Sequence, residues 1–325
     1  WLRSKNRYSA TSVDQLPHHL VSLWLFGHKS LFPIPDIDRS DYFLMLGANP
    51  LASNGSIWTV PDVKKRIRDL QKRGGKLVVI DPRRTETADI ADEHIPVVPG
   101  SDALLLAAIA NTLFSEGLAN PRQLAPFVDG LDEVAQALTD FTPEFAAQHT
   151  GISAEDIRRI AHDFAAAEAA ICYGRMGVST QRYGTLCQYL IQIINIATGN
   201  LDREGGSLFT LPAVDQIPRT GPGGFNRHRS RVRGLPEFDR ELPAAALAEE
   251  ITTPGEGQIR VLVTGAGNPV LSTPNGRALD EALPELDFMV SLDPYINETT
   301  RHAHIILPPT SPLEHDHYDI AFHIN

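Results

Sequence analysis

The sequence contains an internal repeat, and this repeat limits the possible folds more than any other feature. A short apolar run at Tyr42–Leu46 is followed by Gly-Ala-Asn-Pro, and a second run at Lys76–Ile80 ends at Asp81-Pro82. The same order returns after residue 259: an apolar run, then Gly-Ala-Gly-Asn-Pro, then a run at Phe288–Leu292 that ends at Asp293-Pro294. Two such copies predict two similar domains, each with a similar ligand.

Helix and strand patterns alternate along most of the chain. Residues 61–73 place Val63, Ile67 and Leu70 at helical spacing, and two glycines follow them. Such alternation is typical of an open, mainly parallel sheet with helices on its faces. We expect an α/β fold with two doubly wound, Rossmann-like domains.

A stretch without periodicity separates the two copies. Residues 212–236 are rich in Pro, Gly and Arg, a composition typical of a functional loop or a domain crossing. We expect a first domain at 1–211, a crossing loop at 212–236 and an incomplete second domain at 237–325.

Composition excludes several classes of function. The net charge of −11 argues against nucleic-acid binding, which needs clustered Lys and Arg. The only cysteines, Cys172 and Cys187, are too few for a disulfide framework or an iron–sulfur cluster within this chain, so we expect structural thiols. No apolar run reaches about 18 residues, so no membrane span is expected.

The repeat places its turns and its aspartates where a parallel sheet binds ligands, beyond the carboxyl ends of the strands. A glycine there lets the backbone approach a phosphate, and the next helix offers free N–H groups. An aspartate at the next strand end can accept hydrogen bonds from a ribose diol or from guanine. Gly47 with Asp81, and Gly265 with Asp293, are therefore expected to bind one nucleotide each.

These turns have two other interpretations. Neither turn is the G-x-G-x-x-G of an NAD site, because Asn268-Pro269 stands where such a turn would continue into its helix. Gly, Asn and Pro are also ordinary turn formers, and each aspartate could merely cap a strand end. The same order in both copies favours ligand binding.

Several motifs together resemble the molybdopterin oxidoreductase family, which includes dimethyl sulfoxide reductase, formate dehydrogenases and nitrate reductases. The resemblance runs in order from Tyr8 to Glu314. Its motifs are Gly47-Ala48-Asn49-Pro50, Val79-Ile80-Asp81-Pro82-Arg83, Thr198-Gly199-Asn200-Leu201 with Gly205-Gly206, Gly267-Asn268-Pro269, and Ala303-His304-Ile305-Ile306-Leu307-Pro308-Pro309-Thr310-Ser311.

The resemblance implies a bis(molybdopterin guanine dinucleotide) cofactor with Mo or W, in which each domain binds one dinucleotide. It implies two-electron redox or oxygen-atom transfer on a small substrate, with an electron-transfer protein as partner. Family members also carry an N-terminal 4Fe-4S segment and a C-terminal β-barrel, and neither is found in this sequence. We therefore expect a fragment that is inactive alone. The expected compartment is the cytoplasm, with the periplasm open because an export signal would lie upstream.

The residues expected to contact the cofactor lie in the turns and strand ends of the two copies. In the first copy they are Gly47, Asn49, Pro50, Asp81, Arg83, Gly100, Asp102, Gly177 and Ser179, with Arg84 as a further cation near the phosphates. In the second copy they are Gly265, Asn268, Pro269, Asp293, Thr299, Glu314 and His315. For Gly177 and Ser179 an ordinary strand-to-helix turn remains the alternative.

In this family the metal takes one further ligand near the start of the pterin-binding region, and the matching stretch here has no cysteine. Ser9 is the candidate, because an alkoxide is a hard donor suited to a high-valent metal. Tyr8 or Asp14 could take its place, and Ser9 could equally be a plain turn serine.

Three other features of the sequence bear on function. Leu211 stands where formate dehydrogenases of the family carry the arginine that holds formate, so formate is disfavoured. The basic cluster 219–233 is expected to be a solvated loop or a contact to a missing domain, with a phosphate-facing or substrate-steering loop as the alternative. The histidines at 302, 304, 315 and 317 lack zinc-motif spacing.

A second hypothesis is a scaffold that has lost the metal, like the large iron–sulfur subunit of respiratory complex I. Both turns and both aspartates are present, which favours the enzyme, since an empty site has no need of them.

Overall fold

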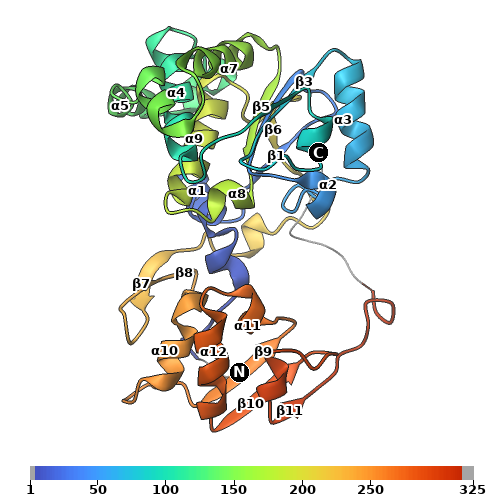
Figure 1. Ribbon diagram of the computed structural model, residues 1–325, viewed down its shortest axis with the longest axis vertical. Helices are drawn as coiled ribbons and strands as arrows, with labels where there is room; N and C mark the ends of the chain where they lie inside the picture. Colours follow the sequence, from blue (N-terminus) through green and yellow to red (C-terminus); the bar gives the residue numbers. More distant parts are fainter. Residues whose placement is uncertain (1–3, 317–325) are drawn as a thin grey trace. The chain divides into compact units, whose positions relative to one another are not determined.

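The computed structural model describes residues 4–316 and divides them into two compact units. We call residues 17–221 the large unit, and residues 4–16 with 222–316 the small unit. Each unit contains one copy of the repeat, on β2 and β3 in the large unit and on β9 and β10 in the small unit (Figure 1).

The elements of the large unit are α1 (Leu16–Phe26), β1 (Pro33–Pro35), β2 (Tyr42–Leu46), α2 (Pro50–Ser53), α3 (Val63–Lys72), β3 (Lys76–Ile80), β4 (Glu93–Ile95), α4 (Asp102–Ser115), α5 (Leu131–Ala137), α6 (Pro143–Thr150), α7 (Ala154–Ala166), β5 (Ala170–Gly174), α8 (Met176–Ser179), α9 (Gly184–Ala197) and β6 (Ser207–Phe209). Those of the small unit are β7 (Phe225–Arg229), β8 (Pro236–Phe238), α10 (Leu247–Thr252), β9 (Val261–Gly265), α11 (Pro269–Ser272), α12 (Gly276–Ala282), β10 (Phe288–Leu292) and β11 (Ile305–Ile306).

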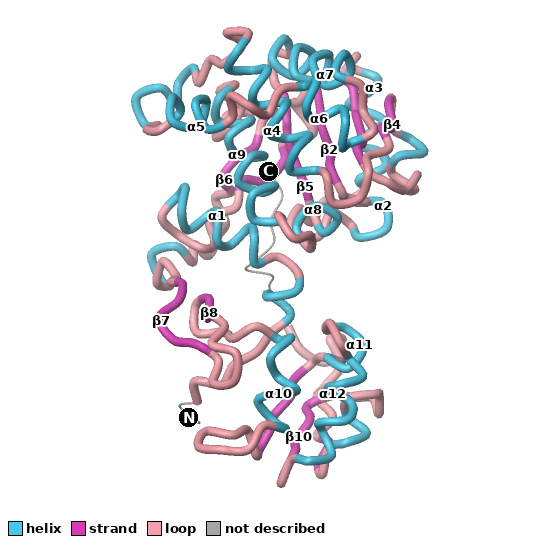
Figure 2. The backbone as a smooth tube through the Cα atoms, turned by 60° about the vertical axis from the view of Figure 1, so that its left-hand side comes forward, coloured by secondary structure: helices cyan, strands magenta, loops and turns pink. Residues whose placement is uncertain are grey.

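The large unit is built on a four-stranded parallel sheet in the order β4-β3-β2-β5. One face of β2 carries Tyr42, Leu44 and Leu46, which are buried with side chains of α4, α7 and α9. The other face carries Phe43 and Met45, which are buried with side chains of α3. Figure 2 shows these strands lying among helices. The doubly wound α/β fold expected from the sequence is confirmed.

Two asparagines close the outer edge of β5. Asn195 accepts a hydrogen bond from the Cys172 N–H and donates one to the Cys172 carbonyl, both at 2.9 Å. Asn200 accepts a hydrogen bond from the Ala170 N–H at 3.1 Å. An exposed strand edge presents unpaired backbone groups, and these side chains satisfy them in place of another strand.

The helix expected at 61–73 is found at Val63–Lys72. Val63, Ile67 and Leu70 form its buried stripe, and Gly74 follows its end with φ = +86°. Ser153 caps α7, since its hydroxyl accepts a hydrogen bond from the Asp156 N–H at 3.0 Å.

The small unit contains a three-stranded parallel sheet in the order β11-β10-β9. Leu262 of β9 and Met289 of β10 pack against α10 and α12 on one face of this sheet. The hydrophobic core of the small unit is smaller than that of the large unit, because fewer helices pack against its sheet.

Two boundaries differ from those expected. Residues 4–16 pack with the small unit rather than with residues 17–211, because Tyr8 forms a β-bridge to Leu242 and the Ser12 hydroxyl accepts a hydrogen bond from the Ala244 N–H. The stretch 212–236 is not wholly a loop, since β7 within it pairs with β8 in an antiparallel hairpin. Both differences depend on contacts that local periodicity does not record.

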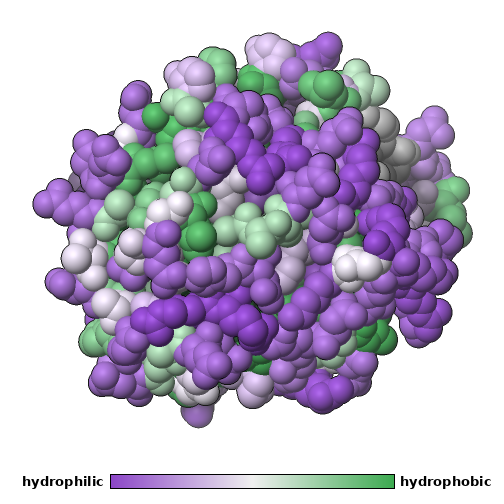
Figure 3. Space-filling view, turned by 90° about the horizontal axis from the view of Figure 1, so that it is seen from above, coloured by the Kyte–Doolittle hydropathy of each residue, from purple (hydrophilic) through white to green (hydrophobic). Residues whose placement is uncertain are grey.

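The face seen in Figure 3 is mostly hydrophilic, and its hydrophobic side chains form separate patches. Within residues 4–316, no helix combines the length and the apolar character needed to cross a bilayer.

Candidate nucleotide-binding sites

The turn that follows β2 lies against the turn that follows β5. Gly47 has φ = +54°, and its carbonyl accepts a hydrogen bond from the Gly177 N–H at 2.9 Å. A Cβ atom at Gly47 would lie 2.8 Å from the Gly177 backbone, and one at Gly177 would lie 2.6 Å from the Gly47 Cα. Because two backbones touch here, both positions require glycine.

Strand order places this contact where ligands bind in such sheets. β3 and β4 lie on one side of β2, whereas β5 lies on the other, so the direction of the strand order reverses between β2 and β5. Open α/β sheets bind ligands beyond the carboxyl ends of the strands at such a reversal. Gly47 and Gly177 stand at that point in the large unit.

The Asn49 side chain ties the turn after β2 to the loop after β3. Its Oδ1 accepts hydrogen bonds from the Thr87 N–H at 3.2 Å and the Thr87 hydroxyl at 2.7 Å, and its Nδ2 donates to Glu86 at 2.7 Å. The Thr87 hydroxyl also accepts one from the Leu51 N–H at 3.3 Å. We call this arrangement the Asn49 clasp. It occupies the Asn49 amide, so any contact of Asn49 with a cofactor would use its backbone.

The small unit repeats the clasp almost atom for atom. The Asn268 Oδ1 accepts a hydrogen bond from the Thr299 hydroxyl at 2.7 Å, and its Nδ2 donates to Glu298 at 2.7 Å. The Val270 N–H donates to the Thr299 hydroxyl at 3.1 Å. We call this the Asn268 clasp. Its presence shows that the repeat extends from the sequence to hydrogen-bond geometry.

The glutamates of the clasps were not predicted as site residues, although the sequence contains their signal. Glu86-Thr87 and Glu298-Thr299 each begin five residues after the aspartate of their copy. A comparison of the copies beyond the Asp-Pro pairs would have found them.

The strand register corrects the pairing of Gly47 with Gly265. Leu46 pairs with Ile80, and Gly265 pairs with Leu292, so Gly265 corresponds to Leu46 as the last residue of its strand. Ala266 corresponds to Gly47: it has φ = +52°, and its N–H donates to the Leu292 carbonyl at 3.0 Å. The sequence Gly265-Ala266-Gly267 is compatible with either register, so the offset of one residue was not evident from it.

The two aspartates occupy equivalent positions and have equivalent contacts. The Asp81 Oδ1 accepts a hydrogen bond from the Arg83 N–H at 2.8 Å, and the Asp293 Oδ1 accepts one from the Tyr295 N–H at 2.8 Å. The second oxygen of Asp81 has no hydrogen-bond partner among residues 4–316, and that of Asp293 accepts a long bond of 3.4 Å from Asn297. Each carboxylate is thus oriented by its own loop and keeps acceptor capacity for a ligand.

Asp102 is the first residue of α4, and Gly100 lies two residues before it. Asp102 is buried, and its carboxylate accepts a hydrogen bond at 2.7 Å from Gln181, which also donates to the Gly177 carbonyl. Burial raises the pKa of Asp102, and the charge of Asp81 raises it further. Asp102 therefore supports the loop after β5, whereas Gly100 lies in open space with φ = +86°.

The remaining candidate site residues of the large unit are Pro50, Arg83 and Arg84, which follow the ends of β2 and β3. Pro50 is the first residue of α2, as Pro269 is of α11, where proline needs no donor. Arg83 and Arg84 are exposed, and they contact Glu86 at 3.7 Å and Asp89 at 2.7 Å.

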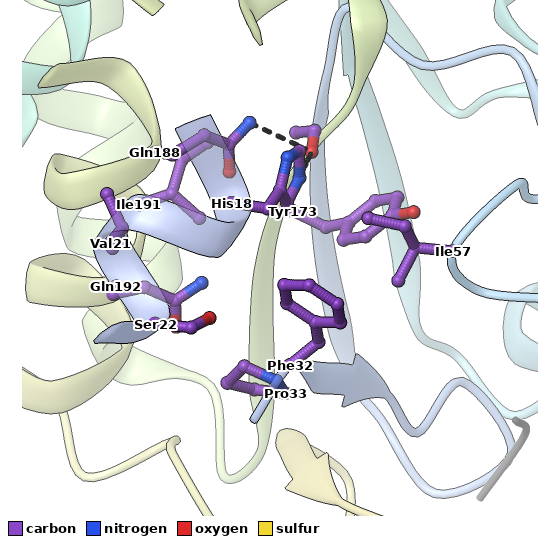
Figure 4. A pocket seen from close by; sticks show the side chains of 11 residues that line it. His18, Val21, Ser22, Phe32, Pro33, Ile57, Tyr173, Gln188, Ile191 and Gln192 are labelled. Atoms are coloured by element: carbon purple, nitrogen blue, oxygen red, sulfur yellow. Dashed lines mark hydrogen bonds between the residues drawn. The ribbon is translucent and has the colours of Figure 1, made fainter. Parts of the chain in front are cut away.

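Ser179 turns its side chain toward the interior. Its buried hydroxyl accepts a hydrogen bond from Gln188 at 2.9 Å and lies 3.5 Å from the His18 Nδ1. The His18 Nε2 lies 3.1 Å from the Gly174 carbonyl, to which Gln188 also donates (Figure 4). Below these groups is a small pocket of about 20 Å³, lined by His18, Ser22, Phe32, Tyr173 and Gln192 among others. Burial, and then the Arg175 charge, lower the pKa of His18 to about 3.

In the small unit, Thr299 belongs to the clasp and is fully buried. Glu314 and His315 are exposed, and their described contacts are with Ser311. His317 lies outside the described residues. Among residues 4–316 no three His, Cys, Asp or Glu side chains form a group that could hold a metal ion.

Ser9, the candidate metal ligand, is engaged within the small unit. Its hydroxyl donates to Glu241 at 2.5 Å and accepts a hydrogen bond from the Thr11 N–H at 3.1 Å, which caps a short 3₁₀ helix at Ala10–Val13. Of the two alternatives, Tyr8 has a buried hydroxyl, and burial raises its pKa. Asp14 ends the same 3₁₀ helix.

The basic cluster neutralises buried carboxylates of the small unit. Arg227 contacts Glu237 at 3.1 Å, Arg231 contacts Glu250 at 3.4 Å, and both glutamates are almost fully buried. The expectation of a solvated loop is therefore wrong for these two arginines, because each charge has an internal partner. Cys172 and Cys187 are buried and free, as expected for structural thiols, and burial raises the pKa of both.

Comparison with known proteins identifies the family of this chain. The family model described as molybdopterin oxidoreductase matches residues 3–321. The chain belongs to the molybdopterin oxidoreductase family.

Relatives within this family have several different names. A nitrate reductase of Symbiobacterium thermophilum is 30% identical over 305 residues, which cover 85% of this chain and 39% of that protein. The F420-dependent formate dehydrogenase subunit alpha of Methanocaldococcus jannaschii is 26% identical, over 87% of this chain and 43% of that protein. The chain thus spans less than half the length of these molybdopterin oxidoreductases.

A solved structure has the same fold. Acetylene hydratase from Pelobacter acetylenicus matches 94% of this chain and 45% of its own, with a TM-score of 0.74 and 19% sequence identity. At this identity the likeness supports the α/β fold alone.

The family name implies a molybdopterin cofactor, and the described residues fit a ligand that carries phosphate groups. The Gly47–Gly177 contact leaves no side chain between ligand and backbone, and Asp81 offers an oriented acceptor beside two arginines. A phosphate can approach such a backbone, and a hydrogen-bond donor of the ligand can pair with such a carboxylate.

The Gly47–Gly177 contact can be tested with an alanine at Gly47. Gly47→Ala meets both a left-handed φ and a backbone only 2.8 Å away, whereas Gly100→Ala meets the same kind of φ in open space. We expect Gly100→Ala to cost about 1 kcal/mol and Gly47→Ala about 2 kcal/mol more, as an overpacked site. Urea denaturation measures both, and equal losses would contradict the close contact.

The buried His18 predicts a pH dependence of stability. Its pKa is lower in the folded state than in the unfolded state, so protonation of the unfolded chain reduces stability as the pH falls from about 6.5 toward 3. Between pH 7 and pH 5 the native chain should lose about 2 kcal/mol more than His18→Gln, which cannot titrate. Urea denaturation at the two pH values measures the difference, and identical losses would show that His18 is not buried as a neutral group.

Proposed function

We propose that this chain is the dinucleotide-binding part of the catalytic subunit of a molybdenum or tungsten oxidoreductase. The cofactor is bis(molybdopterin guanine dinucleotide), with one guanine nucleotide held by each unit. The observation that carries the proposal is the pair of equivalent sites, in which a left-handed turn, an Asn clasp and an oriented aspartate follow the same strands in both units.

The chain's own residues bind and orient the cofactor. The turns at Gly47 and Ala266 bring backbone to the phosphates, and Asp81 and Asp293 accept hydrogen bonds from guanine N1–H and its exocyclic amine. Arg83 and Arg84 offset the diphosphate charge in the large unit. The bound cofactor supplies the two-electron chemistry, and the clasps keep each turn and aspartate in register before the cofactor arrives.

The larger assignments rest on the family resemblance. We propose Ser9 as the protein ligand of the metal, a 4Fe-4S cluster in a segment outside this chain, an electron-transfer protein as partner and a cytoplasmic location. Leu211, where formate dehydrogenases of the family carry an arginine, favours a small substrate other than formate.

Analysis of the full-length protein tests the proposal. Molybdenum or tungsten should be present, with two guanine nucleotides released per metal on acid denaturation. Asp81→Asn and Asp293→Asn should each weaken the binding of one guanine nucleotide about tenfold or more, because a hydrogen bond to a charged group contributes about 1.5–3 kcal/mol.

Asp129→Asn is the matched control, since Asp129 is exposed and lies outside both sites. A native protein with neither metal nor guanine would instead support the metal-free scaffold. If both site variants retain guanine nucleotide normally, the two proposed nucleotide sites are wrong even if the metal is present.

A further inference from the structure

A surface pocket of the large unit lies away from the candidate nucleotide site. Its volume is about 550 Å³, within the range of small-molecule sites, and it is formed by α4, α5, α6 and α7. Figure 1 shows α4, α5 and α7 grouped together in this unit. α4 begins at Asp102, which is linked to the Gly177 loop through Gln181, whereas the pocket lies at its other end, about 14–21 Å along the helix axis. The pocket is therefore separate from the nucleotide turns.

A nearly buried amide in this pocket has an acceptor without a donor. Asn111 is 8% exposed, and its Nδ2 donates hydrogen bonds to the carbonyls of Leu138 at 2.9 Å and Thr139 at 3.4 Å. These bonds orient the amide, and its Oδ1 accepts no hydrogen bond from any residue of 4–316. Because Oδ1 is not fully enclosed by protein, it is open to the pocket that Asn111 lines. Such an acceptor favours a ligand that brings an N–H or O–H group.

Two helices end at the pocket without a positive charge. Thr112 and Ser115 of α4, and Ala135 and Gln136 of α5, line it. The C-terminal end of a helix has a partial negative charge, which Lys, Arg or His side chains can offset. Neither helix has a basic residue in its last turn. These helix ends therefore attract a cation.

The carboxylates that line the pocket outnumber its cations. Glu116 and Glu144 share a single arginine, Arg158, which contacts both. Arg158 lowers the pKa of Glu144, so this carboxylate is ionised at neutral pH. Glu144 also offsets the positive end of α6, because it lies in the first turn of that helix. Between Arg122 and Arg158 the sequence has seven carboxylates and no Lys or Arg, so this stretch supplies no further cation.

We propose that this pocket binds a small organic cation of the polyamine class, whose N–H groups pair with the Asn111 Oδ1 and with the two glutamates. A metal ion fits less well, because no three His, Cys, Asp or Glu side chains of residues 4–316 form a group that could hold one. An anion is disfavoured, since Arg158 already contacts both glutamates. Phe114 and Pro143 offer apolar contacts to the carbon chain of such a ligand.

Calorimetric titration of the full-length protein with spermidine tests this site. The titration is made at about 0.15 M salt, where charges more than about 8 Å apart are largely screened. We expect a Kd of about 1 mM or lower. Triethylene glycol, an uncharged chain of similar length, should not bind. No binding of spermidine, or equal binding of the glycol, would overturn the proposal.

Two variants of the full-length protein locate the binding. Ala135→Trp fills the pocket without a change of charge and should abolish spermidine binding, since Ala135 is half-buried in the pocket wall. Glu144→Gln should raise the Kd about fivefold, because it removes one charged partner of the ligand. Unchanged binding by Ala135→Trp would place the cation elsewhere and overturn the proposal.

Glu155→Gln is the matched control. Glu155 is exposed and lies in the same acidic stretch, but it does not line the pocket. Its loss removes the same charge as Glu144→Gln, and the Kd should change less than about twofold. Equal effects of Glu144→Gln and Glu155→Gln would show a general attraction to the acidic surface in place of a site, and the proposal would fail whatever cofactor the protein holds.

Discussion

The Asn clasp is the interaction on which both candidate sites depend. Asn49 and Asn268 each join a turn at one strand end to the loop at the next, through a threonine and a glutamate that lie far along the chain. An amide side chain suits this task because it accepts and donates at once. The clasp thereby links the turn that we propose approaches a phosphate to the loop that follows the aspartate that we propose binds the base.

The two units use the same arrangement in different surroundings. In the large unit, Gly47 touches the loop after β5, so no side chain fits there. In the small unit, Ala266 takes the same left-handed conformation, and no described strand follows β9 at that edge. The requirement for glycine therefore comes from the neighbouring strand as much as from the turn itself.

The sequence predicted the elements and the chemistry of their ends, because apolar runs, turn residues and Asp-Pro pairs are local signals. It did not predict that Gly265 ends β9 and that Ala266 makes the turn, since Gly-Ala-Gly permits either register. It also missed the Ser9–Glu241 contact and the arginines that neutralise Glu237 and Glu250, because these pairs join residues whose proximity arises only on folding. Residues 4–16 were expected in the first domain, and their packing with the small unit was missed for the same reason.

We propose that two equivalent strand edges each bind a guanine nucleotide. An experimental structure of the full-length protein purified with its cofactor tests this directly. We expect one guanine base hydrogen-bonded to the carboxylate of Asp81 and another to that of Asp293. Guanine bases bound elsewhere, or a single nucleotide with one edge empty, would contradict it.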